Sequence, residues 1–537
     1  MRRPKAPGTV LQALEPATRK LGELEGRALR GEALTLVELA ASLSQCLQEV
    51  ARVAMELVLD QAARAQPCSA PCPCGQEAQS KGFEDTSFVG RFGRVAVSRR
   101  RLTCECGSSS FLLDRAWGLP TGHYTDDVRE ATDRLSCRLG FQEAVAELHH
   151  LWGVAPDAST AKRWIGQDGG RAEAGAEADA AAHWARYEAE AYAIARGERR
   201  QAQRTDGFGV VEVDGVQALT WKPGQEPRRH SGVDKTPATV TSGSAEISAA
   251  SEMGERASRH QAPSTLSQIR GSPMGPTGRS PRVHGREVCV GLVYLGEHAC
   301  QQSPRRGVLL EKRYVATLDD REGFWLKLHA AAATQGVLSR KEVVRISDGG
   351  KYFIDQTAEL FSDQPLVGIL DCQHAKQHVW EAGHELAADK KEVQEWVVPR
   401  AQAIMDGKVA EVIAGLADER ERRRGKPRAA VDELRGYLDR HKHLMDYPRY
   451  QAAGYPLASA AVESANKRLV GRRCKQGGMI WSEPGLEAMV AMRIAFMNPG
   501  AWRSLWPHAE ASPLVKPGIM QRTLGRAAAV VTPSGGP

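Results

Sequence analysis

Apolar residues recur at three- and four-residue spacing over residues 36–64, which is the pattern of an amphipathic helix. Leu39, Leu43 and Leu47 lie on one face of that helix. A helix that packs inside the chain explains this face, and a helix that associates with a second copy is the alternative. Residues 116–200 are helical in pattern too, and they end in an alanine-rich stretch.

Short apolar runs after residue 200 predict strands at 209–214, 218–221, 288–294, 343–347 and 366–370. A helix is predicted at 324–333, and residues 372–445 are mostly helical in pattern. Strands that alternate with helices favour an α/β fold in which helices flank a mixed sheet. Residues 223–285 are rich in Ser, Gly, Pro and Arg, which predicts a disordered insertion.

The composition is that of a soluble globular protein, with 42% hydrophobic and 26% charged residues. The formal net charge of +7 permits a nucleic-acid partner without requiring one. No apolar run is long enough to span a membrane, and no apolar stretch follows the basic N-terminus. We therefore expect a cytoplasmic protein with reduced cysteines and no membrane partner.

Three aspartates, Asp214, Asp348 and Asp371, each stand at the end of a predicted strand. Side chains that handle ligands collect at strand ends in α/β sheets, because the chain leaves the core there. Glycines follow Asp214 and Asp348, and they allow a sharp exit and the close approach of another molecule. A strand-to-turn Asp-Gly is also common without any function.

Glu463 is the only acidic residue between Asp446 and Glu483. Five cations follow it within twelve positions, namely Lys467, Arg468, Arg472, Arg473 and Lys475. A lone acid among cations suits a site where the cations bind a polyanion and the acid binds a metal ion. Carboxylates from distant parts of a chain can hold Mg²⁺ (or Mn²⁺), which activates the nucleophile and stabilises the leaving oxygen of a phosphodiester.

An Asp, Asp, Glu order on strand, strand and helix resembles the DDE transposases, which have an RNase H-like core. The C-terminal block resembles more specifically the ISKra family of bacterial insertion-sequence transposases, in the Mutator-like group. The residues that carry this resemblance are Gly454-Tyr455-Pro456, Ala461–Arg468, Gly477–Glu483, Met492-Arg493, Trp502 and Trp506, with Ser347–Gly350 and Ile369–Lys376 as middle motifs. The resemblance covers about residues 70–506.

The resemblance implies DNA-mediated transposition: binding of the ends of an insertion sequence, then Mg-dependent DNA cleavage and strand transfer. It also implies a homodimer or higher oligomer on DNA, associated with the bacterial nucleoid. The alternatives are a catalytically inactive, transposase-derived DNA-binding protein and a metal-dependent DNA nuclease.

The second catalytic acid is Asp348 or Asp371. Mutator-like transposases carry a Cys/Asp-x-x-His motif shortly after that acid, and Asp371-x-x-His374 resembles this motif. We therefore predict that Asp214, Asp348 and Glu463 are the catalytic, magnesium-binding residues. Asp371 and His374 become supporting residues, and Asp371 as the middle acid is the competing assignment.

Two other groups have competing interpretations. Asp371, His374 and His378 lie on one helix face, either as one edge of a zinc site or as a capping aspartate with histidines that pack or contact phosphate. Trp481 and Met479 follow a Gly-Gly turn, and they either pack in the core or stack on a flipped base.

Two Cys-x-Cys-Gly sequences stand about thirty residues apart. Their cysteines are Cys72, Cys74, Cys104 and Cys106. Four thiolates on short strands suit a tetrahedral structural Zn²⁺, although Cys-x-x-Cys is the usual spacing. Cys68 is an alternative ligand in place of Cys72.

Residues 141–167 predict a helix-turn-helix, with Gly153 in the turn and a second helix that begins at Ser159. This motif would place Lys162 and Arg163 in a major groove of DNA. Two ordinary packed helices are the alternative.

The predicted organisation has seven parts: an N-terminal helical region (1–66), a zinc-ribbon-like region (67–115), a helix-turn-helix-like DNA-binding region (116–200), an RNase H-like catalytic core (201–380, with the insertion 223–285), a helical insertion (381–450), the rest of the core (451–506) and a flexible tail (507–537).

Overall fold

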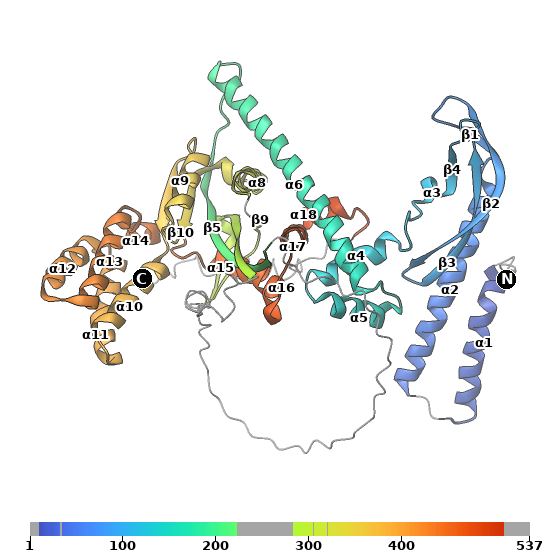
Figure 1. The fold of residues 1–537 in the computed structure, drawn as a ribbon, viewed down its shortest axis with the longest axis horizontal. Helices are drawn as coiled ribbons and strands as arrows, with labels where there is room; N and C mark the ends of the chain where they lie inside the picture. Colours follow the sequence, from blue (N-terminus) through green and yellow to red (C-terminus); the bar gives the residue numbers. More distant parts are fainter. Residues whose placement is uncertain (1–9, 33–34, 223–282, 304–305, 319, 510–537) are drawn as a thin grey trace, which may run out of the picture.

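The computed structural model describes residues 10–32, 35–222, 283–303, 306–318 and 320–509. The predicted α/β class is confirmed, because a mixed sheet lies among many helices (Figure 1). The predicted disordered insertion lies outside the described residues except for its last three, which begin a strand. Most of the predicted tail lies outside them too.

The central sheet has five strands in the order β11-β10-β5-β6-β9. Their bounds are β5 Thr205–Trp221, β6 Val283–Leu295, β9 Arg313–Leu318, β10 Arg340–Ser347 and β11 Leu366–Leu370. β6 is antiparallel to both of its neighbours, β5 and β9. β10 runs parallel to β5, and β11 runs parallel to β10. The two strands predicted at 209–214 and 218–221 are one continuous strand, β5.

Helices cover both faces of this sheet, so the core has three layers (Figure 1). Val211 and its neighbours on one face pack against α8, Arg321–Thr334. Val210 and its neighbours on the other face pack with α10 Cys372–Leu386, α15 Ala460–Asn466 and α17 Glu483–Met497. Both valines are fully buried, which is why the strands read as continuous apolar runs.

Shorter elements complete the core. They are the β7 Ala299–Ser303 and β8 Arg306–Leu309 hairpin, α9 Lys351–Leu360, the π-helix η4 Lys467–Gly471, α16 Arg472–Cys474 and α18 Pro499–Leu505. No described helix has the length and apolarity that a membrane span requires.

The predicted helical insertion contains α11 Lys390–Met405, α12 Val409–Arg422, α13 Gly425–His441 and α14 Tyr447–Ala452. These helices stand beside the β11 edge of the sheet, at the left of Figure 1. α10 crosses the predicted boundary at residue 380 and packs against α11 and α13, so core and insertion share one hydrophobic cluster.

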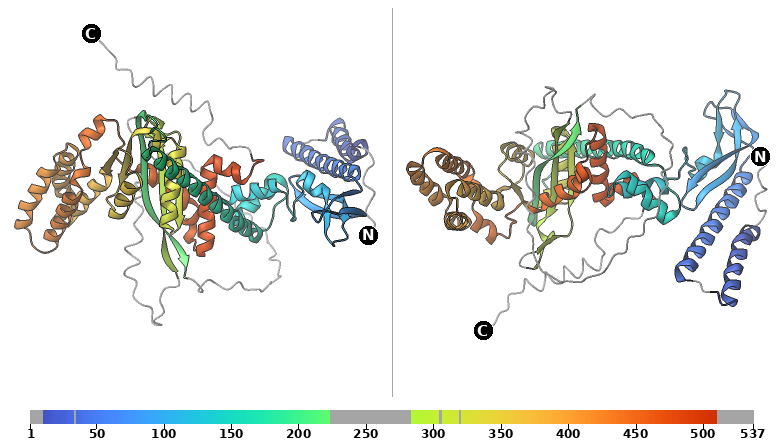
Figure 2. Two further views of the ribbon diagram at one scale, coloured as in Figure 1. Left: turned by 90° about the horizontal axis from the view of Figure 1, so that it is seen from above. Right: turned by 60° about the horizontal axis from the view of Figure 1, so that its bottom comes forward.

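The N-terminal part lies at the other end of the molecule (Figure 2). It contains α1 Val10–Leu29, α2 Leu36–Ala65, a four-stranded antiparallel sheet of β1 Ser69–Pro71, β2 Glu77–Gly90, β3 Gly93–Thr103 and β4 Ser109–Phe111, and α3 Leu112–Trp117. Leu59 and Ala63 of α2 pack on Val95 and Val97, which confirms the packing interpretation for the second half of that helix.

Three helices follow: α4 Asp126–Ser136, α5 Phe141–Trp152 and α6 Ala158–Ala195. Gly153 makes the turn between α5 and α6 with a φ of 70°. Asp157, rather than Ser159, caps α6. α6 continues for 38 residues and packs against α17, where a Cβ on Gly169 would lie 2.4 Å from the Ala488 carbonyl oxygen.

Candidate functional site

Asp214 lies inside β5, opposite Val290 of β6, so the prediction that it ends a strand is wrong. β5 extends further because it pairs with β6 as far as Trp221, whereas its parallel neighbour β10 stops at Ser347. Ile346 of β10 pairs with Glu212 of β5. Because the two strands are parallel, Asp348 and Asp214, each two residues further along, lie at the same level.

Asp348 and Asp371 directly follow β10 and β11, as predicted. Ser347 pairs with Leu370, so the two aspartates follow neighbouring strands at the same level. Together with Asp214, the sheet therefore aligns three carboxyl groups across three adjacent strands.

Glu463 reaches this level from α15, which lies against β5 and β6. Glu212 holds that helix: it accepts a hydrogen bond from the Val462 backbone N–H (2.9 Å) and another from the Tyr294 hydroxyl (2.7 Å). Glu212 has no exposed surface, and burial raises the pKa of its carboxyl to about 7. Glu212 was not among the predicted site residues, although an acid in an apolar run, two residues before Asp214, faces the same side of the sheet.

The carboxyl of Asp214 responds to the charges of the other predicted acids. Burial, together with the negative charges of Asp348 and Glu463, raises its pKa to about 6, although the hydrogen bond from the Gly215 N–H lowers it. His374 lowers it as well. Crowded carboxylates of this kind are relieved by a divalent cation, and oxygen donors suit Mg²⁺ or Mn²⁺. Among the described residues, however, the acidic group whose ligand atoms lie within 4.8 Å of one another does not include Asp214 or Asp348.

Asp371 is fully buried and caps α10, which confirms the capping interpretation. Its Oδ1 accepts from the backbone N–H groups of Gln373 (2.6 Å) and His374 (3.4 Å). Its Oδ2 accepts from the backbone N–H (2.8 Å) and the hydroxyl of Ser459. The carboxylate of Asp348, by contrast, accepts one hydrogen bond from the described residues, and its donor is the backbone N–H of Gly350 (2.9 Å).

Asp371, His374 and Glu463 bring one ligand atom each within 4.8 Å of one another. The predicted zinc edge with His378 does not form, because His378 pairs with Glu381 and its ring packs at a tilt against Tyr437, with 4.0 Å between ring centroids. The four hydrogen bonds that Asp371 accepts leave its oxygens poorly placed to bind a metal ion as well.

A row of residues at four-residue spacing runs away from the acids: Glu463, Lys467, Gly471 and Lys475. With Asn466 and Val216 they line a hollow of about 300 Å³. The Asn466 side-chain amide donates to Asp214 Oδ2 (2.6 Å). The row passes through the π-helix η4, and such helices occur often at functional sites.

The predicted DNA-binding cations differ in exposure. Lys467, Arg468, Arg472, Lys475, Lys162 and Arg163 are exposed. Arg473 is not: it is 1% exposed and donates to the Ser136 carbonyl (2.7 Å). Its guanidinium lies over the rings of Phe141 and Trp481, so its predicted DNA contact is wrong for this structure. Trp481 is buried as well, which confirms that it packs in the core.

Replacing Arg473 with Ala is expected to lower the free energy of unfolding by about 2–4 kcal/mol, because it leaves a cavity between two rings. Arg473→Met keeps most of the volume and should cost less. Arg472→Ala, at an exposed position, is the control and should change stability by less than about 0.5 kcal/mol. Urea unfolding measures all three. Wild-type stability in Arg473→Ala, together with lost DNA binding, would restore Arg473 to the DNA surface.

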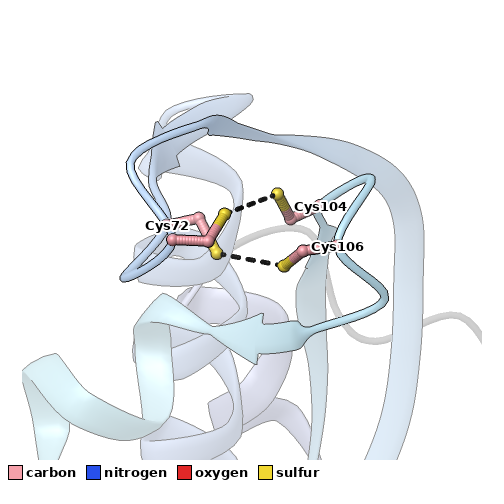
Figure 3. A group of neighbouring side chains, drawn as sticks. Cys72, Cys104 and Cys106 are labelled. Atoms are coloured by element: carbon pink, nitrogen blue, oxygen red, sulfur yellow. Dashed lines mark hydrogen bonds between the residues drawn. The ribbon is translucent and has the colours of Figure 1, made fainter.

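The four predicted zinc ligands converge. Cys72, Cys74, Cys104 and Cys106 bring their sulfurs within 4.8 Å of one another, and their loops face each other (Figure 3). The Cys72–Cys106 and Cys74–Cys104 sulfur distances are 3.7 and 3.5 Å. Zn–S bonds of about 2.3 Å in a tetrahedron place neighbouring sulfurs about 3.8 Å apart, so the group fits Zn²⁺. Cys68 is outside the group and contacts Arg100 instead.

Both cysteine loops have the same backbone turn. The Gly75 N–H donates to the Cys72 carbonyl (2.9 Å), and the Gly107 N–H donates to the Cys104 carbonyl (3.0 Å). These glycines have φ values of 88° and 87°, which other residues rarely adopt. The short Cys-x-Cys spacing therefore works because a glycine turn follows each second cysteine.

Metal binding by Asp214, Asp348 and Glu463 is expected to depend on pH. With a pKa of about 6, the Asp214 carboxyl keeps its proton at a pH where an ordinary aspartate is ionised, and that proton competes with the metal ion. The ionised fraction rises from about one tenth at pH 5 to about nine tenths at pH 7. Calorimetric titration with Mn²⁺ should show roughly tenfold tighter binding at pH 7 than at pH 5. Equal affinity at both values would contradict the placement of Asp214 among the ligands.

Comparison with known proteins gives no family for this arrangement: no family model matches the chain, and no curated protein matches it.

Proposed function

We propose that this protein is a DNA transposase with an RNase H-like core, which cuts and joins DNA with Mg²⁺ or Mn²⁺ held by Asp214, Asp348 and Glu463. One observation carries the proposal. Acids from the middle of β5 and the end of β10 lie at one level of the sheet, and helix α15, packed on β5, carries the third acid beside the exposed cations Lys467 and Lys475. A protein that only binds DNA gains nothing from acids there, since each one weakens its affinity for phosphate.

The five-stranded sheet supports the RNase H-like part of the proposal. The first acid lies on the central strand, the second follows its parallel neighbour, and the third lies on a covering helix. This is the strand, strand and helix order that the DDE resemblance implies. The helices between Asp371 and Glu463 occupy the place of the helical insertion.

Each residue has a role that follows from its contacts. The divalent ion, when bound, activates the attacking oxygen and stabilises the leaving oxygen of the phosphodiester. Asn466 orients Asp214 through its amide, and Glu212 fixes the start of α15, so that Glu463 faces the strands. Lys467 and Lys475 hold DNA phosphates beside the acids. Asp371 fixes the start of α10 and thereby places His374 beside Glu463.

The second acid in this proposal is Asp348. Its carboxylate accepts a single hydrogen bond from the described residues, whereas the carboxylate of Asp371 accepts four. A carboxylate bound by four protein donors has little left for a metal ion.

The N-terminal regions would recognise the ends of the element. The cysteine group would hold a structural Zn²⁺ in a ribbon, and the exposed Lys162 and Arg163 at the start of α6 would contact DNA. Two copies of the chain would act together on two element ends.

The proposal is tested by incubating the purified protein, with Mg²⁺, with a supercoiled plasmid that carries its gene and the flanking genomic DNA. Breaks at fixed positions on either side of the gene, followed by joined products, are expected. Random nicks without joining would favour a nuclease. Specific binding without any break would favour an inactive DNA-binding protein.

A further inference from the structure

A second cavity lies on another side of the helical segment that carries Glu463. Its volume is about 760 Å³. Lys467 and Lys475 line the hollow at the acids, whereas Arg468, Arg472 and Gln476, also at four-residue spacing, line this second cavity. One short segment therefore contributes cations to two separate sites.

The cavity concentrates positive charge. Arg468 and Arg472 face Lys312 and Arg313 from the start of β9, and Arg138 lies at the end of α4. Within the described residues, none of these five cations forms an ion pair with a carboxylate. Glu311 is the one acid in the lining, and its carboxylate lies 3.9 Å from His298.

Lys312 and Arg313 are partly buried, which makes them costly to leave unpaired, whereas Arg138, Arg468 and Arg472 are exposed. Burial and the charge of Arg468 lower the pKa of the Lys312 ammonium to about 8. Lys312 donates to the Leu309 carbonyl (2.7 Å), which holds its amine in place. A fixed, partly buried cation without a carboxylate partner, with exposed arginines beside it, is an arrangement that binds an anion.

The lining also offers a surface for stacking. Phe496 is partly buried, and the Arg138 guanidinium lies 4.8 Å from the centre of its ring. Bases of single strands stack on aromatic rings and on guanidinium planes, while a cationic groove follows the backbone. A cavity of this volume has the size of a small-ligand site and admits a few nucleotides, whereas a duplex does not fit into it.

We propose that this cavity binds an unpaired DNA strand next to the strand that is cut, with Arg468, Arg472 and Lys312 on its phosphates and the Arg138–Phe496 pair against a base. That the polymer is DNA rests on the proposed function. The two strands at an opened end of the insertion sequence are thus kept apart. One strand passes Asp214, Asp348 and Glu463, and the other strand enters this cavity.

The test compares the affinity of the full-length protein for a duplex with a single-stranded overhang and for the same duplex with blunt ends, by fluorescence anisotropy. The double variant Arg468→Ala with Arg472→Ala is expected to bind the overhang DNA at least tenfold more weakly. Its binding should also depend less on salt, with the slope of log K against log salt smaller by about 1.4. Blunt duplex should bind within about twofold of wild type.

The matched control is the double variant Arg424→Ala with Lys426→Ala, which removes the same charge from two exposed positions, one just before α13 and one in its first turn. It should bind both DNAs like wild type. Equal losses for both DNAs, or no loss for the overhang, would overturn the proposal. Inorganic phosphate that competes as well as an oligonucleotide would also overturn it, because the ligand would then be a small anion.

A second measurement remains informative if the variants are unstable. Photo-crosslinking of an overhang that carries 5-bromouracil to the wild-type protein should attach the strand to peptides that contain Phe496 or Arg313. Cross-links confined to other peptides would contradict the proposal. Neither measurement needs cleavage, so a protein that fails to cut DNA yet shows these results would refute the proposed function and leave this inference standing.

Discussion

The Glu463→Gln substitution is expected to lower the rate of DNA cleavage by at least about a thousandfold, because a metal-bound carboxylate supplies several kcal/mol of transition-state stabilisation. Asp348→Asn should have an effect of similar size. Both variants should keep binding of the element ends within about twofold of wild type. Single-turnover cleavage and a band-shift assay measure the two properties.

Asp371→Asn is the matched control, since it changes a neighbouring carboxyl in the same way. Its main effect should be on stability, with a loss of about 1–3 kcal/mol from the cap of α10 and the contact to Ser459. The folded fraction should cleave DNA within about tenfold of wild type. If Asp371→Asn were inactive and Asp348→Asn active, Asp371 would be the second acid.

Loss of one cysteine ligand is expected to unfold the end of the N-terminal sheet that carries the cysteine loops. The core between the cysteine loops contains only Cys72, Ala78, Leu102 and Cys104, with a few partly buried neighbours. Structural Zn²⁺ contributes about 10–16 kcal/mol in small domains of this kind, far more than such a core supplies. The purified protein should therefore hold one Zn²⁺ per chain, and Cys104→Ser should hold none. Mass spectrometry of the metal content and limited proteolysis of residues 69–111 measure this.

Cys68→Ser is the control, because Cys68 is exposed and outside the group. It should keep both the metal ion and the resistance to protease. Retained zinc in Cys104→Ser, or lost zinc in Cys68→Ser, would show that the ligand set is different.

Much of the core follows from local pattern. The strand at 366–370 has the predicted bounds, and the helix over residues 36–64 ends within one residue of the expected place. Both patterns are strong. A strand that is buried on both faces has apolar residues at every position, and a helix that is buried on one face has them at three- and four-residue spacing. Asp348 and Asp371 were placed correctly for the same reason.

Features that depend on distant partners were not predictable. Asp214 lies inside a strand because the antiparallel partner of β5 is longer than its parallel one. Arg473 is buried between Phe141 and Trp481, although its neighbour Arg472 is exposed. The sequence contains the same cationic residue type at both positions, and only the packing of α5 against the C-terminal segment distinguishes them.

Binding of Mn²⁺, followed with electron paramagnetic resonance at pH 7, shows whether Asp214, Asp348 and Glu463 hold a divalent ion. We expect saturable binding to the wild-type protein, at least tenfold weaker binding to Glu463→Gln and Asp348→Asn, and wild-type affinity in folded Asp371→Asn. Wild-type Mn²⁺ affinity in Glu463→Gln and Asp348→Asn would contradict this assignment of the metal ligands.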